Sequence, residues 1–86
     1  MTALRVRYFA ALREALGLAE ESVDLAPEGL SLEALVALLQ ARHGKAAAVL
    51  SGPGVRIAVD QAFVEPESLH LSPGQEVAFL PPVTGG

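Results

Sequence analysis

Three short segments of the chain alternate apolar and polar side chains, and this alternation constrains the fold more than any other feature of the sequence. The segments are Leu4–Phe9, Val55–Asp60 and Gln75–Leu80. Successive side chains of a β-strand point to opposite faces, so alternation with a period of two predicts strands that have one buried face. The chain is therefore expected to build a sheet with an apolar side and a polar side.

Two other segments carry the signals of helices. Ala10–Leu16 is expected to form a short helix that ends at Gly17, because glycine takes the left-handed cap conformation at little cost. A longer helix is expected to begin after Ser31, a good N-cap residue, and to stop at Gly44. The apolar residues that recur there at helical spacing are Leu32, Leu35, Val36 and Leu39.

The order of the expected elements indicates the fold class. Glu21–Leu25 is expected as a return strand, Asp60-Gln61 as a turn into a short strand around Phe63-Val64, and residues 66–73 as a loop. Strands and helices then do not alternate regularly, which favours an α+β fold with one mixed sheet covered by helix on one face. The 86 residues include no cysteine, so the fold must be held by packing, without disulfides or thiolate-bound zinc.

Strand alternation also leaves three large apolar side chains outside the core. One parity of the strands turns Phe9, Phe63 and Leu80 away from the helix. A cluster of exposed apolar side chains usually marks an interaction site. The alternative is a register slip of one residue, which would return these side chains to the core. The residues that this parity turns toward the helix are Leu4, Val6, Tyr8, Ile57, Val59, Val77 and Phe79.

The last six residues, 81–86, are expected to form a tail on a domain of residues 1–80. Pro81-Pro82 ends the last strand and stiffens the exit of the tail, because proline cannot donate to a β-ladder. Gly85 and Gly86 lack Cβ, so the tail is slim enough to thread a narrow tunnel. The terminal carboxylate is ionised at neutral pH, so acyl chemistry there requires activation, most simply as an acyl-adenylate made from ATP. The alternative is an ordinary frayed chain end.

Both ends of the chain resemble one known family. Val77–Gly86, with the sequence VAFLPPVTGG, is similar to the C-terminus of the small subunits of molybdopterin synthase, the sulfur carriers of molybdenum cofactor synthesis. Tyr8–Glu14 resembles the first strand and helix of that family, and residues 59–61 its central turn. The resemblance spans nearly the whole chain and implies a ubiquitin-like β-grasp fold.

The resemblance implies a chemical role for the tail. In that family an adenylating enzyme, related to ubiquitin-activating enzymes, uses ATP to adenylate the last glycine, and sulfur from a persulfide donor converts the adenylate to a thiocarboxylate. The tail then enters the large synthase subunit and donates sulfur to a pterin precursor. Carried over, Gly86 bears the reacting carbonyl and Gly85 permits its entry. The residues implied to contact partners are Phe9, Phe63, Leu80, Pro81, Pro82, Val83 and Thr84.

Two other functions remain open at this point. One is a related ubiquitin-like sulfur carrier for thiamine or another sulfurated product, since those carriers also end in Gly-Gly. The other is a ubiquitin-like protein modifier or interaction module that uses only its apolar surface, because a fold alone does not separate these functions. In each case the chain is expected to bind no cofactor itself and to catalyse no reaction alone.

Charge and histidine content argue against further classes of function. Ten acidic and six basic side chains give a net charge of -4, the wrong sign for gripping nucleic-acid phosphates. No apolar run approaches the length of a membrane span and no signal peptide is recognisable, so a cytoplasmic protein is expected. His43 and His70 lack Asp, Glu or Cys partners at ligand spacing, and are expected at the surface or in turns instead of at a metal or catalytic site.

Overall fold

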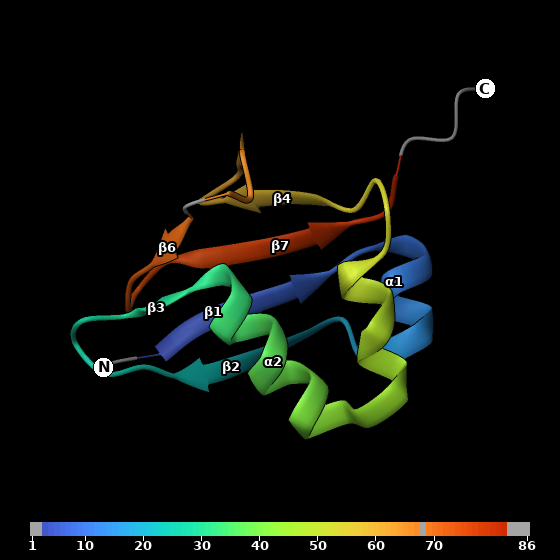
Figure 1. The fold of residues 1–86 in the computed structure, drawn as a ribbon, viewed down its shortest axis with the longest axis horizontal. Helices are drawn as coiled ribbons and strands as arrows, with labels where there is room; N and C mark the ends of the chain where they lie inside the picture. The colour runs from blue at the N-terminus through green and yellow to red at the C-terminus, as the bar shows by residue number, and fades with distance from the viewer. Residues whose placement is uncertain (1–2, 68, 83–86) are drawn as a thin grey trace.

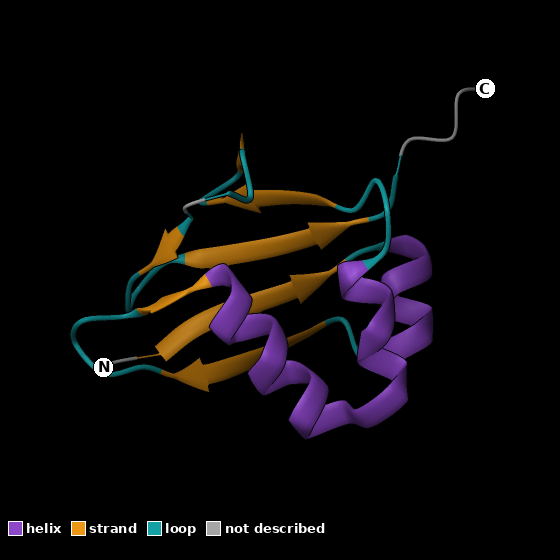
Figure 2. Cartoon of the chain, viewed as in Figure 1, coloured by secondary structure: helices purple, strands orange, loops and turns teal. Residues whose placement is uncertain are grey.

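A mixed β-sheet with helices on one face forms the body of the molecule, as Figures 1 and 2 show. The computed structural model describes residues 3–67 and 69–82. The elements in chain order are β1 (Ala3–Tyr8), α1 (Ala10–Leu16), β2 (Glu20–Asp24), β3 (Leu30–Ser31), α2 (Leu32–His43), the 3-10 helix η1 (Gly44–Ser51), β4 (Arg56–Val59), β5 (Ala62–Val64), β6 (His70–Leu71) and β7 (Glu76–Leu80).

The main sheet has the strand order β2-β1-β7-β4-β5. The first and last strands, β1 and β7, run parallel at its centre, and the other neighbouring strands are antiparallel. This arrangement confirms the α+β prediction. A separate pair, β3 with β6, aligns Leu30 with Leu71. The expectation of a loop across residues 66–73 is therefore wrong at β6, because a strand of two residues is too short to show alternation.

Local capping interactions fix both predicted helices. Gly17 takes the left-handed conformation at φ 75° and donates its N–H to the Arg13 carbonyl at 2.9 Å, which ends α1. The Ser31 hydroxyl accepts the Ala34 N–H at 3.1 Å and caps the start of α2. The 3-10 helix η1 was not predicted, and it follows α2 directly at Gly44.

The inward parity predicted for the strands is confirmed by burial. All of the predicted inward residues are buried except Val59, which is half-buried. The Tyr8 and Phe79 rings stack with centroids 5.9 Å apart. The helices add Leu12, Leu35, Leu39, Ala47 and Leu50 to the same core cluster. One continuous apolar core therefore lies between the sheet and the helices.

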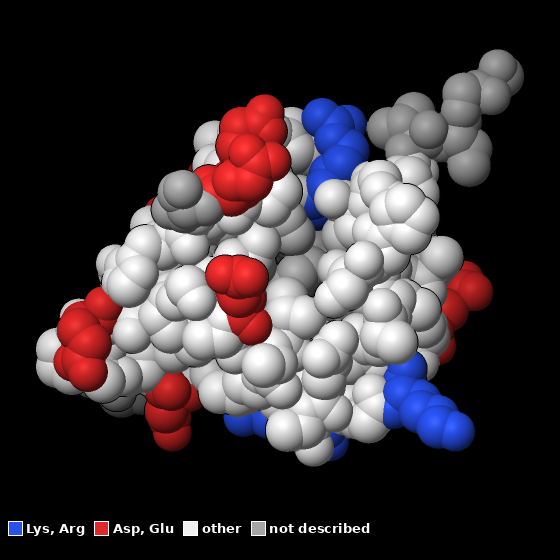
Figure 3. Space-filling model, in the orientation of Figure 1, with Lys and Arg blue, Asp and Glu red and all other residues white. Residues whose placement is uncertain are grey.

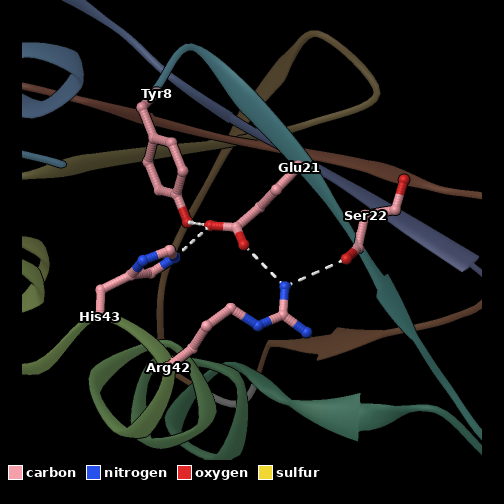
Figure 4. A network of polar contacts seen from close by, with 5 residues as sticks. All are labelled: Tyr8, Glu21, Ser22, Arg42 and His43. Atoms are coloured by element: carbon pink, nitrogen blue, oxygen red, sulfur yellow. Dashed lines mark hydrogen bonds and ion pairs between the residues drawn. The ribbon is translucent and has the colours of Figure 1, made fainter. Parts of the chain in front are cut away.

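A polar network ties the C-terminal end of α2 to the edge of the sheet, as Figure 4 shows. The Glu21 carboxylate accepts hydrogen bonds from the Tyr8 hydroxyl at 2.5 Å and from Arg42 Nη1 at 2.6 Å. His43 Nε2 lies 2.7 Å from the same carboxylate, and Arg42 also donates to the Ser22 carbonyl at 3.2 Å. His43 is thus half-buried against a carboxylate partner that its spacing in the sequence did not reveal.

The network shifts the pKa values of two of its members. Burial on its own would raise the pKa of the Glu21 carboxyl, but the hydrogen bonds from Tyr8, Arg42 and His43 outweigh burial and hold this pKa below its usual 4.5. Burial raises the pKa of the Tyr8 hydroxyl, and the hydrogen bond to Glu21 and the negative charge of Glu21 raise it further. Tyr8 therefore stays a neutral donor and Glu21 an ionised acceptor at neutral pH.

Glu21→Gln is expected to lower the free energy of unfolding by about 1–3 kcal/mol near neutral pH, because the hydrogen bonds from Arg42 and His43 lose their charged acceptor. A carboxyl whose pKa is lowered by folding stabilises the fold above its unfolded pKa, and this contribution is lost as the pH falls through the folded pKa. The difference between the wild type and Glu21→Gln, measured by urea unfolding, should therefore shrink below pH 4.5.

The matched control is Glu20→Gln, on the same strand and half-exposed, which should change the free energy of unfolding by less than about 0.5 kcal/mol. Equal losses for the two variants, or a Glu21→Gln deficit that does not narrow in acid, would contradict this role of the network.

Candidate functional site

The face of the sheet that the helices leave bare carries the three apolar side chains expected there. Phe9 follows β1, Phe63 lies on β5 and Leu80 ends β7. Phe63 is 56% exposed, while Phe9 and Leu80 are half-buried. The register aligns Ala58 with Phe63 on the outward face and Ile57 with Phe79 on the inward face. The alternative of a one-residue slip is therefore wrong.

These side chains border a concavity of about 280 Å³ on the bare face, which we call the outer-face hollow. Ala58 and Ala78 are aligned across β4 and β7 and are only 7% and 6% exposed. Because alanine ends at Cβ, these two residues form a low apolar floor between larger neighbours. The lining residues are Arg7, Phe9, Ala58, Gln61, Phe63, Glu76, Ala78 and Leu80. A hollow with an apolar floor and aromatic edges suits an apolar side chain of a protein partner.

Two arginines cover the aromatic rings at the edges of the hollow. The Arg56 guanidinium carbon lies 3.9 Å from the centroid of the Phe63 ring, and that of Arg7 lies 5.0 Å from the Phe9 ring. Such cation–π contacts at exposed sites contribute about 0.5–1 kcal/mol each. Arg7 also faces Glu76 at 3.7 Å. The rings are thus oriented by neighbours on their own sheet.

The turn between β4 and β5 positions Phe63. Asp60 and Gln61 both have positive φ, 49° and 71°, as a two-residue hairpin turn of type I′ requires. The Asp60 carboxylate accepts the Glu76 N–H at 2.9 Å, and the Asp60 N–H donates to the Glu76 carbonyl at 2.8 Å. These bonds hold a turn without glycine against β7, and they confirm the turn predicted at Asp60-Gln61.

The chain leaves the sheet beside this hollow. Phe9 follows β1 and Leu80 ends β7. Because these two strands are parallel, both residues lie at the same end of the sheet, where the two strands finish. Pro81 is half-buried and Pro82 is exposed. Val83, Thr84, Gly85 and Gly86 lie outside the described residues, so their expected roles stay predictions.

A second, larger hollow of about 430 Å³ lies on the helix-covered side, between α2, η1 and β4. Figure 3 shows this side of the molecule hollowed near its centre. The lining is mainly apolar, with Glu33 as its one ionisable residue. Within residues 3–67 and 69–82, no three His, Asp or Glu side chains gather to hold a metal ion. None of the helices in that part of the chain is long and apolar enough to cross a membrane.

The edges of the outer-face hollow were predicted from the sequence, whereas its floor was not. Ala58 and Ala78 stand at outward positions of two alternating strands, so parity could have assigned them to the bare face. Their small size is the signal that would have revealed the floor, since two alanines between large outward residues predict a depression. The contact of Arg56 with Phe63 joins β4 to β5 and left no local pattern, whereas Arg7 and Phe9 stand only two residues apart in the sequence.

The arrangement of the sheet defines the class of protein. A mixed sheet whose first and last strands pair in parallel at its centre, packed on one main helix, is a ubiquitin-like β-grasp fold, as in related solved structures. The family follows from the sequence, because residues 6–86 match the ThiS family model. The chain therefore belongs to the ThiS family.

Individual relatives agree with this assignment. The chain is 35% identical over 83 residues to the molybdopterin synthase sulfur carrier subunit of Escherichia coli (strain K12), covering 96% of this chain and 99% of that one. A solved structure of a putative molybdopterin converting factor, subunit 1, from Pyrococcus furiosus is 32% identical with a TM-score of 0.73, covering 96% of this chain and 100% of that one. The fold also recurs, at 24% identity and a TM-score of 0.64, in a complex of subunits 1 and 2 of molybdopterin-converting factor from Helicobacter pylori 26695, covering 98% and 99% of the two chains.

A pair of truncations tests the division between the two faces of the sheet. Phe79→Ala is expected to lower the free energy of unfolding by about 3–5 kcal/mol, because it opens a cavity in the core. Phe63→Ala should cost about 1 kcal/mol or less, since it removes only a cation–π contact and partial packing. Chemical unfolding of both variants measures the difference, and similar losses would mean that Phe63 belongs to the core.

Proposed function

We propose that this chain is the sulfur-carrying small subunit of a molybdopterin synthase. The observation that carries the proposal is its similarity, over nearly the full length of both chains, to the Escherichia coli sulfur carrier subunit of that enzyme. The outer-face hollow beside the chain exit supports it, because a carrier must dock on a partner while its terminus reaches a reaction centre.

The proposed reacting atom is the carbonyl carbon of Gly86. A separate adenylating enzyme joins a carboxylate oxygen of Gly86 to the α-phosphorus of ATP, and pyrophosphate leaves. A persulfide then attacks the carbonyl carbon through its terminal sulfur, and AMP leaves. A thiol then attacks the donor sulfur of the resulting acyl disulfide. The S–S bond breaks, the thiol and the donor end joined as a disulfide, and Gly86 is released as a thiocarboxylate. The chain has no cysteine, so no side-chain thiolate of its own competes for the activated carbonyl.

The proposed recipient is a pterin precursor held by the large synthase subunit. The outer-face hollow binds the large subunit, while the tail of residues 81–86 extends from the domain toward its pocket with Gly85 and Gly86 as the slim leading end. Six residues span at most about 20 Å when fully extended, so the docking surface must lie close to the point where the tail begins. Phe9 and Leu80 satisfy this requirement, because both lie at the edge of the sheet where the chain leaves it.

Loading of the terminus tests the proposal. Incubation with the cognate adenylating enzyme, ATP and a persulfide donor should increase the intact mass of the chain by the difference between sulfur and oxygen. A variant that lacks Gly86 should gain nothing, because the activated carboxylate is displaced by one residue, and omission of ATP is the control. Loading of the shortened chain at the wild-type rate, or no loading of the wild type, would refute the proposal.

Docking tests the role of the outer-face hollow. Phe63→Asp should weaken binding to the large subunit by about 2 kcal/mol or more, roughly thirty-fold in Kd, because a charge would be buried in an apolar contact. Val49→Asp is the matched control, since Val49 is the other exposed large apolar residue of the described chain and lies on η1. Calorimetric titration should show wild-type affinity for Val49→Asp. Equal affinities of the two variants would place the docking surface elsewhere.

A further inference from the structure

The loop before β4 touches the first residues of the tail. Gly54 has φ 80°, and a Cβ placed on it would lie 2.7 Å from Cβ of Pro82 and 3.5 Å from its Cγ. Non-bonded carbon atoms normally approach no closer than about 3.5 Å. Any side chain at position 54 would therefore push Pro82 away by roughly an ångström. Because glycine has no side chain, Pro82 packs directly on the loop.

This loop is held by the body of the domain and not by the tail. The Gly52 N–H donates to the Val49 carbonyl at 3.1 Å, which attaches the loop to the end of η1. Leu50 of η1 is buried in the core, and on the other side of the loop Arg56 aligns with Leu80 across β4 and β7. Figure 1 shows the loop passing beside the end of β7, where the chain leaves the sheet. The residues on both sides of Gly54 are thus held by contacts other than the one with Pro82.

We infer that Gly54 is a positioning residue for sulfur transfer, because by seating Pro82 it sets the point and direction from which residues 83–86 leave the domain. The inference rests on the proposed function. Residues 83–86 span at most about 14 Å, so the seat of Pro82 limits where Gly86 can reach. A misplacement of about 1 Å at a reacting group can cost up to roughly a hundredfold in rate. Displacement of Pro82 should therefore slow transfer without weakening docking.

A second glycine provides a matched control for backbone strain. Gly74 has φ 90°, and a Cβ placed there would meet nothing within 4 Å. Gly74 lies just before β7, whereas Gly54 contacts Pro82, which lies just after β7. The two glycines therefore act at opposite ends of that strand. Gly54→Ala and Gly74→Ala thus introduce similar strain, whereas only Gly54→Ala displaces the tail. Because Pro82 is exposed, the clash is relieved by movement of the tail and not by opening of the core.

The experiment measures a single turnover of sulfur transfer to the large subunit holding the pterin precursor. The donors are full-length chains loaded completely as thiocarboxylates, and their intact mass verifies the loading. Gly54→Ala should transfer sulfur about tenfold or more slowly than the wild type, with its Kd for the large subunit changed by less than about twofold. Gly74→Ala should match the wild type in both quantities. Wild-type transfer by Gly54→Ala, an equal loss in Gly74→Ala, or a parallel rise in Kd would overturn the inference.

A measurement on the isolated protein separates failure of this inference from failure of the proposed function. Nuclear Overhauser contacts between the Gly54 α-protons and the Pro82 ring are expected in the wild type and in Gly74→Ala. Their absence from the wild type would overturn the seat even if sulfur is carried. Their presence in a wild type that cannot be loaded would instead refute the carrier function.

Discussion

The parallel pairing of β1 with β7 is the constraint on which the rest of the structure depends. Parallel strands need a crossover connection, and here that connection contains every helix of the described chain, so the helices cover a single face. The register aligns Tyr8 with Phe79 inside and Arg7 with Ala78 outside. It also brings the end of the first strand to the edge where the tail begins. One pairing thereby sets the core, the bare face and the chain exit together.

Under the proposed function, the two faces of this sheet have different roles, one in folding and the other in binding the partner. The inward face carries large side chains such as Phe79, which are fully buried against the helices. The outward face carries a floor of Ala58 and Ala78 and an exposed Phe63, which contribute little to the core. A chain of 86 residues without cysteine cannot add disulfides to compensate for a damaged core. Because the residues proposed to bind the partner point away from the core, they can change without loss of the fold.

Features encoded by neighbouring residues were predictable from the sequence, and features formed across the sheet were not. Strand alternation and the caps at Gly17 and Ser31 depend on residues within one turn or one strand, so the α+β class and the exposure of Phe63 followed from them. The two-residue pairing of β3 with β6 and the 3-10 helix η1 are too short or too irregular to show a period. The Glu21 network and the contact between Gly54 and Pro82 join residues at least 13 positions apart, so no local pattern indicates them.

Mapping amide chemical shifts while the large synthase subunit is added tests most directly which face of the sheet binds the partner. We expect the partner on the bare face and not on the helix-covered face. The largest changes should fall on residues of the outer-face hollow, including Ala58, Phe63 and Ala78, and at Leu80 beside the chain exit. The amides of α2 should keep their shifts. Large changes along α2 with an unchanged outer face would contradict this division of the two faces.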